Sequence, residues 1–189
     1  QIAASDKAAR RWQKLDPKRA DAAAAVALAS VQLYKPEDAS AAILRTHALG
    51  GDEALDELMG KLSDAGGWAI TLEALRPTLE SPDVSEKLLI AGVDLALENF
   101  DFTTAHKLAD RVLTSDPASG DARAQLARVL SAEGDAVAAI AIAQEAAALD
   151  PETQRFAYAD TLLRLDRLDE ARQELESLRA DASVRDDAD

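Results

Sequence analysis

The sequence predicts an all-α protein in which antiparallel helix pairs stack one after another into a right-handed superhelical α-solenoid. Alanine (42 residues) and leucine (26 residues) together make up more than a third of the 189 residues, and both are strong helix formers. Proline recurs at regular intervals along the chain. Because aromatic residues make up only 4% of the composition, the core must come from many close contacts between neighbouring helices.

The prolines and glycines define the expected units. Asp116-Pro117 and Asp150-Pro151 lie 34 residues apart, Pro82 precedes Pro117 by 35 residues, and Gly50-Gly51 supplies the break expected between Pro17 and Pro82. A fixed period of this length is typical of a helical repeat array. The expected segments are an N-terminal half unit at 1–17, an array at 18–180 with units at 20–51, 52–82, 86–117, 120–151 and 152–180, and a disordered tail at 181–189.

Hydrophobic spacing supports helices within these units. Leu55, Leu58, Met59 and Leu62 have the i, i+3, i+4, i+7 spacing of one helical face. The segment 136–149 is apolar almost all round, so we expect it to lie well inside the array. Pro77 falls inside a predicted helix, where it removes a hydrogen bond and favours a kink or an early stop.

The unit at 120–151 carries the clearest motif. Its first helix contains the large–small pair Leu126-Ala127, Gly134-Asp135 forms the turn, Ala139 opens the core side of the second helix, and Asp150-Pro151 closes the unit. This pattern resembles the tetratricopeptide repeat (TPR) family. The resemblance covers nearly the whole chain, is strongest over 120–178 and weakest over 20–51, and departs from the pattern at Gly92-Val93.

The TPR resemblance implies a concave face that is lined by the first helix of each unit and binds a partner protein or peptide. Alanine-rich, acidic sequences without cysteine are also similar to bacterial envelope proteins with many TPR units. That narrower likeness favours a periplasmic or envelope location over the cytoplasm. Because residues 1–17 correspond to half a unit, we expect the native chain to continue before Gln1.

Residues on the first helices give the candidate binding surface. The expected groove passes from apolar through acidic to a mixed end with arginine and phenylalanine, so a partner with a basic segment would match it. The alternative is that these charges only solvate the face. The partner-binding residues expected from the resemblance are Asp56, Glu57, Lys87, Asp94, Glu98, Arg128, Phe156, Asp160 and Arg164.

Composition and motifs argue against several other classes. A net charge of −14 with a pI near 4.5 disfavours nucleic acid, which requires a basic surface. No apolar run reaches the roughly 18 residues of a membrane span, and the sequence has no cysteine. His47 and His106 lie in different units, acidic pairs such as Asp52-Glu53 occur on solvated helix faces, and no Gly-Lys-Ser/Thr follows Gly66-Gly67. We therefore predict no catalytic, cofactor-binding or metal-binding residues.

Three functions remain open at this point. The chain is expected to be an interaction scaffold or adaptor rather than an enzyme. One alternative is a regulatory TPR arm of a larger enzyme or sensor whose catalytic domain lies outside these residues. The other is a self-assembly module, in which the exposed ends of the stack pair between copies and form a homo-oligomer.

Overall fold

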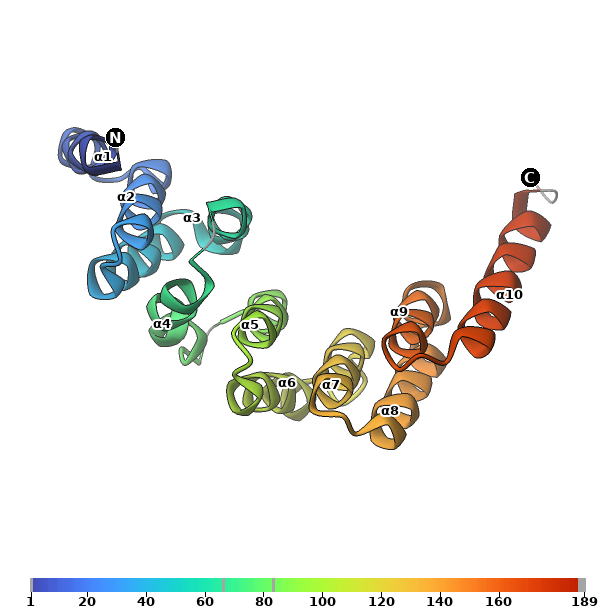
Figure 1. Ribbon diagram of the computed structural model, residues 1–189. Helices are drawn as coiled ribbons and strands as arrows, with labels where there is room; N and C mark the ends of the chain where they lie inside the picture. Colours follow the sequence, from blue (N-terminus) through green and yellow to red (C-terminus); the bar gives the residue numbers. More distant parts are fainter. Residues whose placement is uncertain (1, 66, 83, 187–189) are drawn as a thin grey trace. The chain divides into compact units, whose positions relative to one another are not determined.

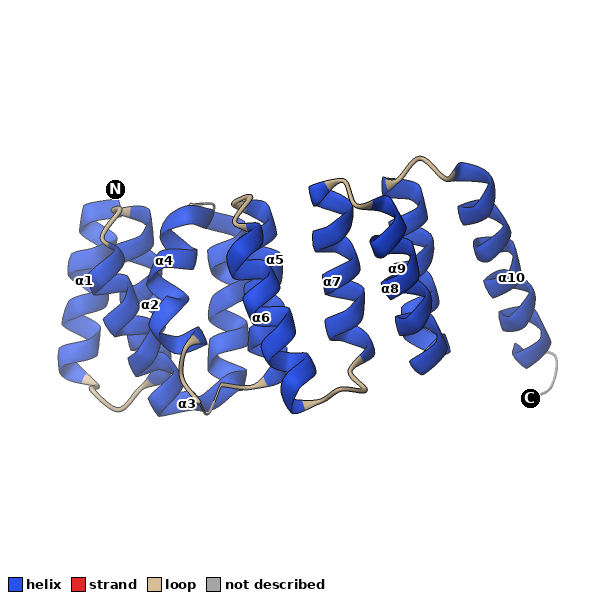
Figure 2. Ribbon diagram, turned by 90° about the horizontal axis from the view of Figure 1, so that it is seen from below, coloured by secondary structure: helices blue, strands red, loops and turns tan. Residues whose placement is uncertain are grey.

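The computed structural model describes residues 2–65, 67–82 and 84–186. Within these residues it contains ten helices and no strand (Figures 1 and 2). The predicted all-α class is therefore confirmed. The helices are α1 (Ile2–Leu15), α2 (Ala20–Gln32), α3 (Pro36–Ala65), α4 (Trp68–Leu79), α5 (Glu86–Glu98), α6 (Phe102–Ser115), α7 (Gly120–Glu133), α8 (Ala136–Leu149), α9 (Pro151–Arg164) and α10 (Leu168–Asp186).

The chain divides into two compact units, Gln1–Asn99 and Phe100–Asp189. In unit 1, each helix from α1 to α5 packs against the next one in the sequence. In unit 2, the same holds from α6 to α10, and α9 also contacts α7. Cohesion within each unit thus comes from contacts between neighbours along the chain, as expected of a repeat stack.

One bend divides α3 into two helical halves. Gly51 has φ 65° and ψ −158°, a left-handed conformation that glycine adopts most easily. The adjacent Gly50 leaves no room for a side chain, because a Cβ there would lie 2.4 Å from the Cβ of Ala54 and 2.9 Å from the Cβ of Ala20. Gly50-Gly51 therefore makes the joint between consecutive helix pairs in the place that proline occupies elsewhere.

Backbone conformation repeats at the turn inside each helix pair. Five residues with positive φ follow one another at intervals of 32 to 34 residues, and each lies between the first and second helix of a pair. Two of them are glycines, whereas the other three are residues that adopt this conformation less readily. The five residues are Tyr34 (φ 56°), Gly67 (φ 83°), Phe100 (φ 56°), Gly134 (φ 88°) and Asp166 (φ 59°).

Short polar side chains begin several helices. The carboxylates of Asp101, Asp135 and Asp150 accept hydrogen bonds from the backbone N–H groups three residues later, at 3.1, 3.1 and 3.3 Å. Ser119 does the same for α7 at 3.1 Å. Such caps satisfy N–H groups that have no partner within the helix. Pro151 follows its cap at the first helical position, where its missing N–H and fixed φ are tolerated.

The structure corrects the expected position of the segment 136–149. In α8 only Ala139, Ala143 and Ala146 are buried, and Val137 is 83% exposed. The prediction that this helix lies well inside the array is wrong. The helix packs on α7 and α9 through its alanine side, and its opposite side faces solvent although it is apolar.

The ends of two helices, α4 and α10, can be compared with the sequence-based expectation. Pro77 lies inside α4, which ends two residues later at Leu79. The tail expected to be disordered over 181–189 is helical as far as Asp186, and residues 187–189 lie outside the described residues. Arg155 of α9 explains part of this extension, because it donates a hydrogen bond of 2.7 Å to Asp181 and one of 2.9 Å to Ser177.

Candidate partner-binding surface

The predicted site residues fall into two sets, one in each unit. The α3–α5 face comprises Asp56, Glu57, Lys87, Asp94 and Glu98, which lie on the second half of α3 and on α5. The α7–α9 face comprises Arg128, Phe156, Asp160 and Arg164. All nine residues lie on the first helix of a pair. Each face is considered by itself, because the two belong to different units.

An ion pair connects the two helices of the α3–α5 face. The ammonium group of Lys87 on α5 donates a hydrogen bond to the Oδ2 atom of Asp56 on α3. This hydrogen bond raises the pKa of Lys87 above its ordinary value, and the charges of Asp56 and Asp52 raise it further. The first helices of consecutive pairs therefore present side chains to one shared surface.

The acidic part of this face is partly neutralised by the chain itself. Asp52 lies 3.2 Å from the Nε2 atom of His47, Asp56 pairs with Lys87, and Glu57 pairs with Lys61 at 2.7 Å. Asp56 and Glu57, the carboxylates of the last two pairs, are adjacent residues of α3. Surface pairs of this kind are weak and open readily.

A buried amide connects the two helices of the α7–α9 face. The Nε2 atom of Gln154 on α9 donates a hydrogen bond to Asp121 on α7, and Gln154 is only 3% exposed. Sequence reasoning missed this contact. The sequence did contain a clue to it, because Gln154 occupies the position in α9 that the buried Ala122 occupies in α7. A polar group at such a core position requires a hydrogen-bond partner.

The predicted residues of the α7–α9 face make short-range contacts within their helices. Arg128 donates to the side-chain oxygen of Gln125 at 2.8 Å, and Arg164 donates to Asp160 at 2.6 Å. Phe156 is exposed. This face therefore combines an exposed aromatic ring with side chains of both charges, and it differs in character from the acidic α3–α5 face.

A second connection in unit 2 was also missed. The guanidinium group of Arg155 on α9 contacts Glu174 and Asp181 of α10, and the hydrogen bonds to these carboxylates raise the pKa of Arg155. The partners lie 19 and 26 residues away along the chain. Because these spacings do not match the repeat period, no sequence pattern points to the contact.

Neither histidine belongs to a cluster of potential metal ligands. His106 Nε2 on α6 lies 2.9 Å from Glu133 on α7, and His47 pairs with Asp52. Across the described residues, no group of three or more His, Cys, Asp or Glu side chains is arranged to hold a metal ion. Within the same part of the chain, no helix has both the length and the apolar character of a membrane span.

Comparisons with known proteins agree with the repeat geometry. Residues 98–178 match the family model described as "Anaphase-promoting complex, cyclosome, subunit 3", a model of TPR-like repeats. No curated protein matches the chain in sequence.

Solved structures with a similar fold include the human IFIT1 dimer with m7Gppp-AAAA (TM-score 0.58, 14% identity, 94% of this chain and 45% of that chain). The human IFIT1 dimer with PPP-AAAA has a TM-score of 0.56, 14% identity, and coverage of 94% of this chain and 46% of that chain. The crystal structure of the P58(IPK) TPR domain has a TM-score of 0.38 and 16% identity, and it covers 94% of this chain and 55% of that chain.

The chain spans less than half of the length of these IFIT1 chains, and at this identity the likeness concerns the fold alone. The family model supports the predicted TPR resemblance over residues 98–178, and helix pairs also follow one another in the rest of the described chain. The described chain is thus a succession of helix pairs that resembles TPR-like repeats over residues 98–178, and a TPR-like fold generally mediates protein–protein interactions.

Proposed function

We propose that this protein is an interaction scaffold or adaptor that binds a segment of a partner protein across the first helices of its pairs, with the α3–α5 face as the main contact. The observation that carries this proposal is the Lys87–Asp56 pair. It indicates that α3 and α5 offer one continuous polar surface, long enough for a peptide to contact both helices.

The charge of the α3–α5 face favours a partner with basic residues. Four carboxylates lie within residues 52–57, and the side chains of Glu53 and Glu57 are exposed. Lys61 and Lys87 offset only part of this charge. A lysine- or arginine-rich segment would gain attraction and lose little on desolvation at such an exposed surface.

The same charge argues for a protein partner over a nucleic acid. The IFIT1 structures with a similar fold hold m7Gppp-AAAA or PPP-AAAA, ligands that are rich in phosphate. This chain has a net charge of −14 and would repel phosphates, since nucleic-acid affinity depends on displacing counterions with basic side chains.

A pull-down with a charge-reversed variant tests the proposal. The wild-type chain captures partners from a lysate of the source cells, and mass spectrometry identifies them. The double variant Asp56→Lys with Glu57→Lys is expected to lose the specific partner. The control, Glu73→Lys with Asp110→Lys, changes the net charge equally on exposed positions of the second helices α4 and α6 and is expected to retain it. Equal capture by both variants would contradict the proposal.

A further inference from the structure

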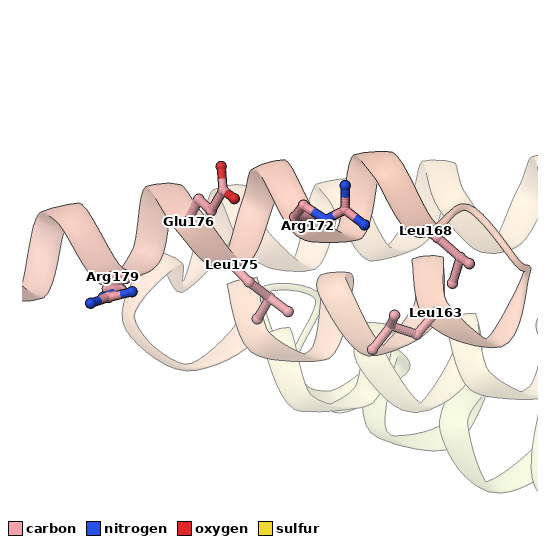
Figure 3. A pocket seen from close by; sticks show the side chains of 6 residues that line it. All are labelled: Leu163, Leu168, Arg172, Leu175, Glu176 and Arg179. Atoms are coloured by element: carbon pink, nitrogen blue, oxygen red, sulfur yellow. The ribbon is translucent and has the colours of Figure 1, made fainter.

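An apolar pocket lies beside the first helix of the chain and another beside the last. In the pocket between α9 and α10, Leu163 and Leu175 face each other (Figure 3). The pocket between α1 and α2 includes Ser5, Ala9 and Trp12 of α1. Each pocket lies where one more helix of the stack would pack, so neither indicates a partner. Another side of α1 differs from both pockets, because it is basic.

The part of α1 that a stack covers can be identified from α8. First helices pack on both sides of α8, namely α7 and α9, and the three buried residues of α8 are alanines. Counted back from Pro151, these alanines have the same spacing as three residues of α1 counted back from Pro17. The three residues of α1 are Ser5, Ala9 and Trp12, which also line the pocket beside α2. A first helix before α1 would therefore pack against this part.

Three basic side chains occupy a different face of α1. They are exposed and have the spacing i, i+4, i+7, so they share one face of the helix. The equivalent residues of α8 are also exposed, although helices pack on both sides of α8. This face of α1 is therefore accessible even when first helices flank it. The basic residues are Lys7, Arg11 and Lys14, and their equivalents in α8 are Ala141, Glu145 and Ala148.

An exposed leucine adjoins the basic residues. Leu15 follows Arg11 by four residues, so it lies on the same face, and it is 76% exposed. Leu149, its equivalent in α8, is 48% exposed with α7 and α9 in place. Exposure of a large apolar residue at this position thus does not depend on a missing neighbour. We call Lys7, Arg11, Lys14 and Leu15 the α1 outer face.

The three cations of the α1 outer face have no carboxylate partner among the residues that the structure describes. Arg10 differs from them, since it donates a hydrogen bond of 2.8 Å to Asp6 and another of 2.8 Å to Asp38. Residues 7–15 include no acidic residue, so all 35 acidic residues of the chain lie elsewhere. Like charges at i, i+4 oppose helix formation. The α1 outer face therefore keeps its positive charge for a carboxylate from outside the chain.

The size of the α1 outer face favours a protein segment as its occupant. Lys7 and Lys14 lie about 10 Å apart along the helix axis, whereas a membrane or a nucleic acid presents phosphates over a much larger area. Such a surface would also meet the rest of a chain whose net charge is −14, which repels it. A second copy matches poorly, because carboxylates of its α3–α5 face are paired with Lys61 and Lys87. An acidic segment of another protein meets neither obstacle.

We propose that the α1 outer face binds an acidic segment of a partner protein. Carboxylates of this segment meet Lys7, Arg11 and Lys14, and an apolar side chain beside them contacts Leu15. The charges select the partner and the apolar contact adds affinity. The α1 outer face selects acidic segments, whereas the α3–α5 face selects basic ones. The proposal therefore does not depend on the function proposed for the α3–α5 face.

Binding of a designed peptide to the full chain tests the proposal. The probe is a fluorescent helical peptide of about four turns with glutamates at i, i+4 and i+7 and one leucine beside them, and the readout is anisotropy. The double variant Lys7→Glu with Arg11→Glu is expected to weaken binding by about tenfold. The control, Lys35→Glu with Arg76→Glu, makes the same change of net charge at exposed residues before α3 and on α4. It is expected to stay within about twofold of the wild type, because salt screens distant charges.

A pair of leucine variants separates a specific contact from general attraction between charges. Leu15→Ala is expected to weaken binding of the probe by about threefold, whereas Leu149→Ala, at the equivalent residue of α8, is expected to bind like the wild type. Circular dichroism checks that each variant remains helical. The proposal is overturned if the wild type does not bind the probe, if Lys7→Glu with Arg11→Glu behaves like its control, or if Leu15→Ala behaves like Leu149→Ala.

Competition and light scattering test the other occupants. Unlabelled peptide is expected to displace the probe more effectively than phosphatidylserine vesicles or single-stranded RNA at equal concentrations of negative charge. Stronger displacement by the vesicles or by the RNA would assign the α1 outer face to a membrane or to a nucleic acid and would overturn the proposal. Self-association of the wild type that Lys7→Glu with Arg11→Glu abolishes would identify a second copy as the occupant, and this too would overturn it.

Discussion

Lys87 of α5 donates a hydrogen bond to Asp56 of α3, a residue that precedes it by 31 positions in the sequence. The contact aligns two first helices and occupies a carboxylate that a basic partner would otherwise meet. Lys87 thus has two opposing effects, since it helps to define the surface and also competes with any lysine or arginine that approaches it.

Removing this competitor is expected to tighten binding. In Lys87→Gln the carboxylate of Asp56 becomes available, so a lysine-rich peptide should bind roughly threefold more tightly than it binds the wild type, an effect of the size expected for one surface charge. Fluorescence anisotropy at low and at high salt measures it, and the gain should shrink as salt screens the charges. Lys18→Gln, in the loop before α2, removes an equal charge elsewhere. The idea fails if both variants bind alike.

Two glycines of α3 are expected to respond in opposite directions to alanine. Gly50→Ala places a Cβ against Ala54 and Ala20, and overpacking of this kind costs about 1–3 kcal/mol. Gly60 has no atom within 4 Å of an added Cβ, so Gly60→Ala should stabilise by about 0.5–1 kcal/mol through its better helix propensity. Urea denaturation followed by circular dichroism measures both. Destabilisation of similar size in the two variants would show that the joint at Gly50 is not tightly packed.

The turn residues with positive φ are expected to store strain. Tyr34 is exposed and has φ 56°, so Tyr34→Gly should stabilise the fold by up to about 1 kcal/mol. Phe100→Gly should gain less, because Phe100 packs edge-on against Phe102 with ring centroids 6.5 Å apart and that contact is lost.

Gly134→Ala provides the reverse test of the same turn. It introduces strain at φ 88° where nothing lies within 4 Å of the new Cβ, and it should destabilise by about 1 kcal/mol. Thermal and urea unfolding of the three turn variants give the comparison. A neutral Gly134→Ala together with a destabilising Tyr34→Gly would reverse the predicted order.

The buried amide of Gln154 is expected to be coupled to Asp121. Asp121→Ala leaves the amide without its acceptor, and an unsatisfied buried polar group costs about 1–3 kcal/mol. Combining it with Gln154→Leu replaces the amide by an apolar group of similar size, so the double variant should recover part of the loss. A double-mutant cycle of unfolding free energies measures the coupling. Strictly additive single effects would mean that the hydrogen bond contributes nothing.

The positions of the breaks between helices could be predicted from the sequence because they depend on the residues at each break. Prolines and glycines stop helices for steric reasons, and each one acts on its own neighbours. Pro82, Pro117 and Pro151 accordingly lie between helices or at the first residue of one. Gly50-Gly51 was correctly taken as a break although the helix on either side is otherwise continuous.

Exposure and long-range pairing were less accessible to sequence reasoning. The apolar composition of α8 does not say which side a neighbour covers, and Val137 proved to be on the uncovered side. The helix at residues 181–186 was missed because small charged residues resemble a tail, whereas Arg155 connects Asp181 to α9. The partners Asp56 and Lys87 were both expected at the binding surface, but their pairing depends on how far α5 lies from α3, and no local pattern gives that distance.

Site-specific photo-crosslinking tests the central claim, which is that a partner protein lies across the first helices of unit 1. A photoreactive phenylalanine analogue replaces Glu53, an exposed residue at the start of the second half of α3, or Val137, an exposed residue on the second helix α8. After irradiation with the captured partner, we predict a crosslinked partner peptide that is rich in lysine or arginine from residue 53 and none from residue 137. Crosslinks that form from residue 137 and not from residue 53 would contradict the account.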